Sequence, residues 1–458
     1  MGDLEFDSTL IQCVPDARQL RHQQTEFYAF IHFTVNTFTD KEWGDGTESE
    51  SVFNPASLDA EQWVRAVKSA GMKGLILTAK HHDGFCLWPS AYTEHSVKNS
   101  PYKNGKGDVV REAAEACRKG GIKFGVYLSP WDRNSPLYGQ GVPYDDYFCA
   151  QLRELLTDYG ELFSVWFDGA CGEGPNGKKQ VYDWERYYAV VRELQPDACI
   201  SICGPDVRWC GNESGKTRLC EWSVIPTGFN DNGETKIAAT DEDLGSRTLL
   251  QQASGLAWKH AEVDVSIRPG WFWHKSENQK VKSLKELEDI YFRSVGGNCT
   301  LLLNIPPDVN GHIADKDVKR LEQLGRLLAA DFANDLASDA VFEASLDDGI
   351  HTVENVRTDS YDTYFKTPDG ENEVTITVSL PEAKKIHIVE IKENILFSQR
   401  IERFSIEYHC GKGWKHLYDG TTVGYKKYAR FRPVLTDSIK IHIIDSRVCP
   451  VISHIAIY

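Results

Sequence analysis

Asp168 is the residue of this sequence whose surroundings point most directly to chemistry. It follows the apolar run Ser164–Phe167 and stands next to Gly169. An unbroken apolar run predicts a strand that is buried on both faces. Packing gives little reason for a carboxylate at the end of such a strand, whereas reactive groups collect at the C-terminal strand ends of barrels and open α/β sheets. On this evidence alone, Asp168 is either a catalytic carboxylate or a structural group that caps a helix or joins an ion pair.

Polar and aromatic residues follow several other predicted strands in the same way. They are His32, His81, His82, Asp83, Tyr127, Arg208, Trp209, Glu213, Trp271, Trp273 and His274. If the strands are parallel, their C-terminal ends share one rim and these side chains converge. A single histidine is usually structural, but several histidines, tryptophans and acids at successive strand ends favour a functional site.

The residue types at these positions suit a carbohydrate. Neutral histidine and tryptophan N–H groups donate to sugar hydroxyls, and the flat face of tryptophan covers apolar C–H surface. Hydrolysis of a glycosidic bond needs two carboxyl groups. One acts as nucleophile or base, and the other stays protonated to release the leaving group.

A metal site is the alternative, because His32, His81, His82 and Asp83 offer imidazole and carboxylate ligands. We expect no metal, since neighbouring residues of an extended segment, such as His81 and His82, should point to opposite sides. The cysteines also lack the paired Cys-x-x-Cys spacing of zinc sites. No phosphate-binding glycine loop or Gly-x-Ser-x-Gly motif is present, so we expect no cofactor.

These side chains must be positioned by the strands that precede them. Eight apolar segments read as strands: 27–32, 74–79, 123–128, 162–167, 198–203, 219–222, 263–267 and 299–303. Amphipathic helices alternate with them, and Asp59, Asp108 and the Ser283/Glu286 pair supply helix-capping signals. Eight strand–helix repeats predict a (β/α)8 TIM-like barrel over residues 1–335.

The pattern changes after a last predicted helix over residues 315–332. Val374, Ile376 and Val378 begin a period-two alternation of apolar and polar residues that continues toward the C-terminus. This periodicity predicts an antiparallel β-sandwich over residues 336–458. We expect this domain to brace the barrel rather than to bind glycans.

The overall composition narrows the partners. The net charge is −16 and no basic tract is present, which disfavours nucleic acid and anionic membranes. No run of 18 apolar residues exists, so no membrane insertion is expected, and the segment Met1–Phe6 does not look like a signal peptide. Twelve cysteines in a chain of this length do not suggest a disulfide framework, and we expect most to be reduced.

The segment His81–Ser90 resembles the HHDGFxLWxS signature of glycoside hydrolase family 29, the retaining α-L-fucosidases. Phe30–Phe33 with Glu42-Trp43, Val165–Gly169 and Asn298–Pro307 are similar to other segments of this family, so the resemblance covers essentially the whole chain. It implies a fucosylated oligosaccharide or glycoconjugate as substrate. It also suggests a periplasmic or extracellular location, because members of this family are often exported.

The resemblance implies roles for individual residues. Asp168 matches the nucleophile. The positions that match substrate contacts are His32, Glu42, Trp43, His81, His82, Tyr127, Trp166 and Arg208, with either Trp271 or Trp273 near the sugar methyl group.

Arg208–Glu213 is similar to a motif of the subfamily that cleaves α-1,3/1,4-linked fucose from branched glycans. This similarity implies that Glu213 is the acid/base, with Glu221 and Glu262 as competitors. The implied mechanism is double displacement with retention, for which the two carboxyls lie about 5–5.5 Å apart. Two alternatives are a broad-specificity α-L-fucosidase and a catalytically silent fucose-binding protein.

Overall fold

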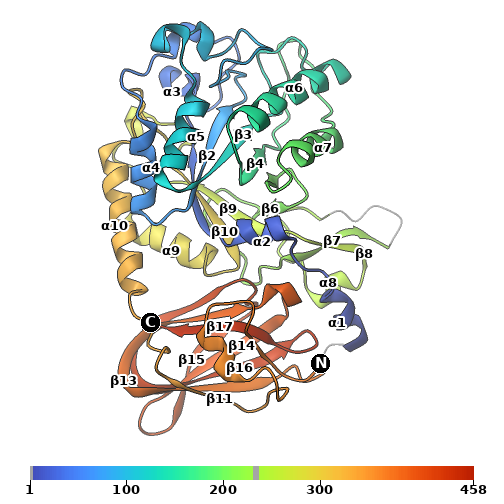
Figure 1. Cartoon of the computed structure of the whole chain (residues 1–458), viewed down its shortest axis with the longest axis vertical. Coiled ribbons are helices and arrows are strands. Elements are labelled where there is room, and N and C mark those ends of the chain that lie inside the picture. The colour runs from blue at the N-terminus through green and yellow to red at the C-terminus, as the bar shows by residue number, and fades with distance from the viewer. Residues whose placement is uncertain (1–3, 231–236) are drawn as a thin grey trace.

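The computed structural model describes residues 4–230 and 237–458 and consists of a barrel stacked on an antiparallel sheet domain (Figure 1). Eight parallel strands close the barrel in the order β1-β10-β9-β6-β5-β4-β3-β2. They are β1 (Phe27–Ile31), β2 (Gly74–Lys80), β3 (Lys123–Leu128), β4 (Ser164–Phe167), β5 (Cys199–Ile202), β6 (Val207–Trp209), β9 (His260–Ser266) and β10 (Cys299–Asn304). The predicted fold class, a TIM-like barrel followed by an antiparallel β domain, is confirmed.

One strand prediction is wrong. Residues 219–222 form a loop, and the sixth barrel strand is β6, which spans only three residues. It pairs with β5 at a single position and with β9 at three. A three-residue strand that contains Arg208 carries no apolar run, so periodicity could not reveal it.

Most of the helices surround the barrel, and the rest lie beside the C-terminal domain. The helices are α1 (Leu4–Leu10), α2 (Ala17–Gln23), α3 (Val35–Thr39), α4 (Ala60–Ser69), α5 (Val109–Gly120), α6 (Val142–Asp158), α7 (Trp184–Leu194), α8 (Arg247–Leu250), α9 (Leu284–Ser294) and α10 (Asp315–Asp331). The predicted caps form: the Asp59 and Asp108 carboxylates accept backbone N–H groups at the starts of α4 and α5, and Ser283 and Glu286 make a reciprocal capping box. A two-stranded hairpin, β7 (Val224–Phe229) with β8 (Ala253–Trp258), lies beside the barrel.

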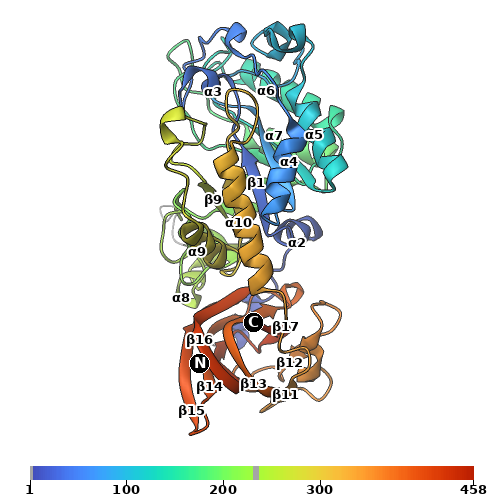
Figure 2. The same ribbon diagram turned by 90° about the vertical axis from the view of Figure 1, so that its left-hand side faces the viewer.

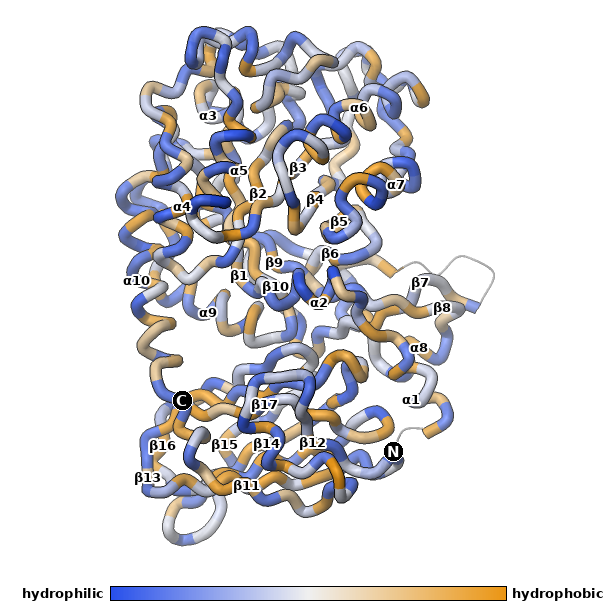
Figure 3. The backbone as a smooth tube through the Cα atoms, viewed as in Figure 1, coloured by the Kyte–Doolittle hydropathy of each residue, from blue (hydrophilic) through white to orange (hydrophobic). Residues whose placement is uncertain are grey.

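The C-terminal domain is a seven-stranded antiparallel sheet. Its strands are β11 (Val341–Ala344), β12 (Phe365–Lys366), β13 (Val374–Glu393), β14 (Ile401–His409), β15 (Trp414–Gly420), β16 (Lys427–Ser446) and β17 (Val451–Ile457). The predicted apolar positions, among them Ile376, Val378 and Ile441, are buried in one core. Hydropathy accordingly alternates along parts of these strands in Figure 3.

The two domains are in direct contact. Helix α10 runs along the barrel and leads to the sheet domain (Figure 2). Ile388 and Tyr428 of the sheet belong to the core cluster of the barrel. The Tyr428 ring lies 5.5 Å from that of Phe292 in α9 and 4.9 Å from that of Phe332. The second domain is therefore packed against the barrel through aromatic side chains.

All twelve cysteines are free in the structure, and Cys117, Cys149 and Cys299 are buried in the apolar positions expected of them. Within residues 4–230 and 237–458, no helix has the length and apolar character needed to cross a bilayer. The first three residues of the segment Met1–Phe6 lie outside the described residues.

Candidate active site

A cavity of about 220 Å³ opens at the C-terminal rim of the barrel strands. Its lining consists of Phe30, His32, Glu42, Trp43, His81, His82, Tyr127, Trp166, Asp168, Ala170, Glu213, Asp264 and Trp271. Ten of the predicted site residues therefore meet in one place. Arg208 and Trp273, which were also predicted, do not line this cavity.

Asp168 lies one residue beyond β4 and is held by two hydrogen bonds. The backbone N–H of Ala170 donates to Oδ1 at 2.8 Å, and the Tyr127 hydroxyl donates to Oδ2 at 3.0 Å. Burial and the neighbouring carboxylate raise the pKa of Tyr127, so its hydroxyl remains a donor. His82 Nε2 lies 3.8 Å from Oδ2, and the carboxylate is 25% exposed. The group is thus oriented by neighbours but accessible to a ligand.

The three histidines of the cavity are neutral near pH 7. Burial lowers the pKa of His32 to about 3 and also lowers the pKa values of His81 and His82. The His32 Nδ1 atom lies 2.9 Å from Asn304 Oδ1, and His82 Nδ1 lies 2.7 Å from the Ser129 hydroxyl. Neutral imidazoles fixed in this way suit a ligand rich in hydroxyl groups.

The prediction that His81 and His82 point to opposite sides is wrong. Their ring centroids are 4.1 Å apart, and both rings line the cavity. Strand β2 ends at Lys80, so the pleat that alternates side chains no longer applies. Asp83 is fully buried and accepts hydrogen bonds from the Phe85 backbone and the Thr34 hydroxyl. Among the described residues, no group of three or more potential ligands is arranged to hold a metal ion.

Trp166 connects the cavity to a buried carboxyl group beneath it. Its Nε1–H donates to Glu262 Oε1 at 2.7 Å, and the Tyr28 hydroxyl donates to the other oxygen of the same carboxyl. Burial raises the pKa of Glu262 to about 7, although both hydrogen bonds oppose that change. Glu262 is 0% exposed and does not line the cavity.

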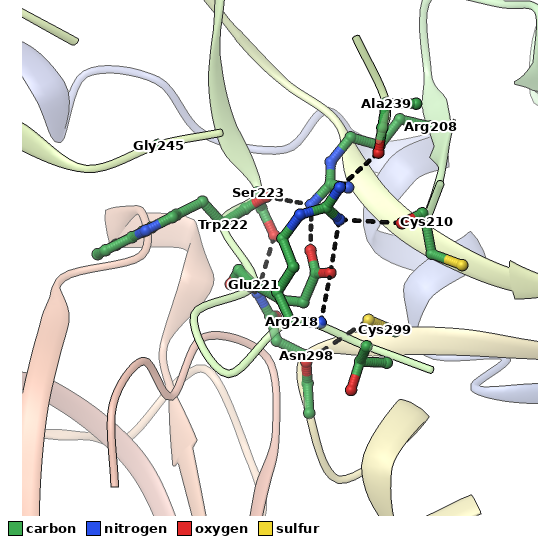
Figure 4. A network of polar contacts seen from close by, with 12 residues as sticks. Arg208, Cys210, Arg218, Glu221, Trp222, Ser223, Ala239, Gly245, Asn298 and Cys299 are labelled. Carbon is green, nitrogen blue, oxygen red and sulfur yellow. Dashed lines mark hydrogen bonds and ion pairs between the residues drawn. The ribbon is translucent and has the colours of Figure 1, made fainter. Parts of the chain in front are cut away.

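The other two candidate glutamates differ in the freedom of their carboxylates. Glu213 is exposed on the loop after β6 and accepts a hydrogen bond from Trp271 Nε1 at 3.1 Å. Glu221 is 1% exposed and lies between Arg208 Nη2 at 2.5 Å and Arg218 Nη1 at 2.9 Å (Figure 4). Its paired carboxylate is unsuited to proton exchange with a ligand. The same pairing directs the Arg208 guanidinium toward Glu221 and the Trp222 carbonyl.

Glu42 joins the loop after β1 to the loop that carries Trp271. Its carboxylate accepts the backbone N–H groups of Trp271 at 2.8 Å and Phe272 at 3.1 Å. The ring of His274 bridges Glu42 and Asp40 at 2.6 Å each. Burial acts against the charged ring, but these hydrogen bonds raise the pKa of His274. Of the two candidate tryptophans, only Trp271 reaches the cavity, whereas the Nε1 atom of Trp273 is buried and has no hydrogen-bond partner among the described residues.

Asp264 is a site residue that the sequence reasoning missed. It lines the cavity, is 3% exposed and accepts a hydrogen bond from Trp209 Nε1 at 2.7 Å. Burial, reinforced by the nearby Glu262 carboxyl, raises the pKa of Asp264. The sequence did hold a signal for this residue. Glu262 and Asp264 alternate with Val263 and Val265 on a strand that was expected to be buried, where acids are rare unless they have a function or a partner.

A second cavity of about 730 Å³ adjoins the first. The two share Trp166, Asp168, Ala170, Glu213 and Asp264. The larger one extends past Arg208 and Trp209 to the β7 residues Ile225, Pro226 and Thr227. A ligand held at Asp168 therefore has room for a bulky substituent on the Glu213 side.

Comparison with known proteins gives consistent matches. A family model described as alpha-L-fucosidase matches residues 14–331. The chain is 41% identical over 453 residues to alpha-L-fucosidase 1 of Arabidopsis thaliana, covering 97% of this chain and 87% of that one. A solved structure from Bacteroides ovatus, assigned as an alpha-L-fucosidase, has 46% identity and a TM-score of 0.88 over 99% of this chain and 76% of that one. A Ruminococcus gnavus GH29 fucosidase solved in complex with fucose has 34% identity and a TM-score of 0.86 over 97% and 95% of the two chains.

Proposed function

The chain belongs to the alpha-L-fucosidase family of glycoside hydrolases, and from this premise we propose that it releases terminal L-fucose from α-1,3- and α-1,4-linked branched glycans by double displacement. The α-L-fucosidase activity follows from family membership. The linkage and the roles of individual residues are the proposal.

Asp168 is proposed as the nucleophile. Its Oδ atom attacks the anomeric carbon of fucose, and the bond from that carbon to the glycosidic oxygen breaks. The product of this step is a fucosyl ester of Asp168. The hydrogen bonds from Tyr127 and Ala170 hold the carboxylate, and its exposed quarter leaves an oxygen accessible for the attack.

Glu213 is proposed as the acid/base. It gives its proton to the departing glycosidic oxygen, then takes a proton from the water that hydrolyses the ester. The observation that carries this assignment is that Glu213 alone of the three candidate glutamates lines the cavity with Asp168. Glu221 is held in ion pairs, and Glu262 is buried beneath Trp166.

The sugar is proposed to bind between the neutral histidines and the tryptophans. His32, His81 and His82 offer N–H donors and ring nitrogen acceptors to hydroxyl groups, while Trp271 and Trp43 offer aromatic surface to the methyl group and the C–H faces. The fucose complex of the Ruminococcus gnavus relative supports a fucose-containing ligand in this fold. Of the two candidate tryptophans, we assign Trp271 to the sugar, because only Trp271 lines the cavity.

Two observations support the proposed linkage. The segment Arg208–Glu213 is similar to the motif of the subfamily that acts on α-1,3/1,4-linked fucose. The adjoining cavity of about 730 Å³ includes Glu213 in its lining, on the side where the leaving group must lie, and its volume is in the range of small-molecule binding pockets.

A linkage panel tests this proposal. Fucose release is measured from Lewis-type trisaccharides with α-1,3 or α-1,4 fucose, from an α-1,2-fucosylated disaccharide and from an α-1,6-fucosylated N-acetylglucosamine. We expect kcat/KM for the Lewis-type substrates to exceed the others by about 100-fold, which is the discrimination that a few pocket contacts supply. Equal kcat/KM across the panel would instead establish a broad-specificity enzyme.

A further inference from the structure

We infer that the C-terminal domain positions Glu213 through a continuous chain of contacts: Gln399 holds residues 221–223, these hold Arg218, and Arg218 holds the loop of residues 210–213. This inference rests on the proposed acid/base role of Glu213. It assigns a catalytic purpose, rather than a purely structural one, to the contact between the two domains.

The loop that carries Glu213 is tied to the barrel on both sides of this residue, because the Cys210 N–H donates to the Glu262 carbonyl at 3.0 Å and Ser214 forms an isolated bridge with Val265. The loop leaves β6 after three strand residues, and Glu213 itself is exposed. Gly211 has a φ of +99°, and a Cβ atom at this position would lie 2.1 Å from the Ala239 carbonyl oxygen. The loop therefore packs tightly against the segment that contains Ala239, and its path depends in part on what fixes that segment.

Arg218 fixes both segments at once. Its guanidinium donates to the carbonyls of Cys210 at 3.0 Å and Asp241 at 2.7 Å, and also to that of Ala239 (Figure 4). The Cys210 thiol in turn donates to the Asn212 carbonyl at 3.2 Å. A planar guanidinium can hold several acceptors in fixed directions, which a lysine cannot reproduce.

Glu221 fixes the guanidinium. Its carboxylate accepts Arg218 Nη1 at 2.9 Å and Arg208 Nη2 at 2.5 Å and is 1% exposed. A buried carboxylate is tolerated only while its partners stay in position. The geometry of this Arg208–Glu221–Arg218 cluster is therefore strictly defined, and any shift of the Glu221 backbone is passed to Arg218.

The C-terminal domain helps to place the Glu221 backbone, together with Asn298 of the barrel, whose Nδ2 donates to the Glu221 carbonyl at 3.0 Å. Gln399, which is fully buried, donates to the Glu221 carbonyl at 2.9 Å and accepts the Ser223 N–H at 2.8 Å. Arg447 stacks on the Trp222 ring with its Cζ atom 4.0 Å from the ring centroid and donates to the Gly245 carbonyl at 2.6 Å. Residues 221–223 are thus held in part by the side chains of Gln399 and Arg447 of the second domain.

A displaced acid/base has a recognisable kinetic signature. Protonation by Glu213 matters when the leaving group is a poor one, such as a sugar hydroxyl. It matters little for an acidic phenol, which leaves without help. A general loss of folding or of fucose binding slows both kinds of substrate alike. Because Arg208 and Ala239 line the adjoining cavity, a trisaccharide would also report lost contacts to the leaving group. The ratio of kcat/KM for two aryl fucosides of similar shape but different leaving-group acidity therefore isolates the position of Glu213.

The experiment uses two variants. Gln399→Leu removes both hydrogen bonds from Gln399 to residues 221–223. Arg218→Lys keeps the positive charge but lacks the planar guanidinium that donates to several acceptors. The second variant keeps the test valid if the first does not fold. The control is Thr436→Val. Thr436 is 2% exposed and donates only to His409 at 2.9 Å and Ser438 at 2.7 Å, within the C-terminal domain. Each protein is assayed with 2,4-dinitrophenyl α-L-fucoside and with phenyl α-L-fucoside, whose leaving group has a similar shape but is much less acidic.

We expect both test variants to lose about ten-fold or more of kcat/KM on phenyl α-L-fucoside, a part of the 10²–10⁴-fold that general acid catalysis supplies, with less than about three-fold loss on the 2,4-dinitrophenyl fucoside. The control should leave the ratio of the two substrates at the wild-type value. Equal losses on both substrates, or no loss on either, would overturn the inference.

Glu213→Ala, assayed alongside, separates the inference from the function on which it rests. A selective loss in Glu213→Ala without one in Gln399→Leu or Arg218→Lys refutes only the positioning role. If Glu213→Ala shows no selectivity, the acid/base assignment itself is wrong, and the inference is wrong with it.

Discussion

The two halves of the barrel rim hold their functional groups in different ways. In the first half, β1 to β4, most of the side chains emerge at or directly after strands of four to seven residues, and Asp168 is one residue beyond its strand. Glu42 and Trp43, on the loop after β1, are the exceptions. In the second half, β6 has three residues and the β7–β8 hairpin interrupts the alternation. Glu213 projects there from a loop whose position we infer to depend in part on the C-terminal domain.

This difference follows the chemistry that each half is proposed to perform. The nucleophile must meet one atom of the sugar, so a carboxylate fixed by Tyr127 and the Ala170 backbone suits the task. The acid/base serves two partners in turn, a leaving group and a water molecule, on the side that opens to the larger cavity. A loop held by remote contacts leaves that side accessible.

The largest expected effect tests whether the two carboxyls hold different roles. Asp168→Ala should lower kcat/KM for aryl α-L-fucosides by about 10⁴-fold or more, as loss of a nucleophile does. Azide added to this variant should give the β-fucosyl azide, because a single displacement inverts the anomeric carbon. Azide added to Glu213→Ala should give the α-fucosyl azide through the intermediate on Asp168. The anomeric configuration of each product is measured by NMR.

The same azide anomer from both variants would show that the two halves of the rim do not divide the reaction in this way. Glu221→Ala and Glu262→Ala serve as comparisons. Formation of α-fucosyl azide in one of them, and not in Glu213→Ala, would move the acid/base to that residue.

A smaller effect concerns Glu262. This residue of β9 accepts a hydrogen bond from Trp166 of β4 and so links the two halves of the barrel. Its pKa is raised from 4.5 to about 7, so between these values the folded protein binds a proton that the unfolded chain has released. Stability is therefore lost as the pH rises through this window, by about 3 kcal/mol in total. Glu262→Gln removes this titration and lessens the rise in the pKa of Asp264, so its unfolding free energy relative to wild type should rise between pH 4.5 and pH 8.

Urea denaturation of both proteins at several pH values measures this difference. Glu393 of the C-terminal domain also has a pKa raised to about 7 by burial, but it contributes equally to both proteins and cancels. Parallel stability curves for wild type and Glu262→Gln would show that the Glu262 carboxyl does not titrate in this range.

The smallest effects compare the side chains that orient the two carboxyls. Tyr127→Phe removes the hydroxyl donor to Asp168, and Trp271→Phe removes the N–H donor to Glu213. From the ratio of kcat/KM values, we expect Tyr127→Phe to lose about 1.5–3 kcal/mol of transition-state stabilisation, because the lost hydrogen bond serves a partly buried charge. The loss in Trp271→Phe should be about 1 kcal/mol, because Glu213 is exposed.

Kinetics on aryl fucosides and on a trisaccharide distinguish these two variants further. Tyr127→Phe should slow both substrates, whereas Trp271→Phe should slow mainly the trisaccharide. A larger loss in Trp271→Phe than in Tyr127→Phe would contradict the view that the first half of the rim is the more tightly organised.

Sequence reasoning worked best where local structure is regular. Long apolar runs such as Gly74–Lys80 revealed their strands, and capping side chains such as Asp108 revealed the helix starts. Because residues directly after parallel strands must share a rim, His32 and Asp168 were correctly expected to meet. In the C-terminal domain, period-two alternation was equally clear, since one face of each strand is buried.

It failed where long-range contacts override local pattern. Residues 219–222 have strand-like composition but form a loop, because Glu221 is drawn into ion pairs with Arg208 and Arg218. His81 and His82 share a cavity, because the chain turns after Lys80. Asp264 was overlooked, since its burial among other cavity residues is visible only when β9 and the loops around it are assembled.

The sequence by itself determined the barrel, the sheet domain and the position of Asp168, because strand periodicity and the strand-end rule are local properties. The resemblance of the segment His81–Ser90 to a family signature indicated the family. The motif Arg208–Glu213 favoured Glu213, but only the tertiary structure shows that Glu213 lines the cavity with Asp168 and that Glu221 and Glu262 do not. Glu213, Glu221 and Glu262 are all acids within 50 residues of one another, and what separates them is environment. One faces the cavity, one is neutralised by two arginines, and one is buried under Trp166. Burial and charge pairing arise from segments distant in the chain, so no local pattern encodes them.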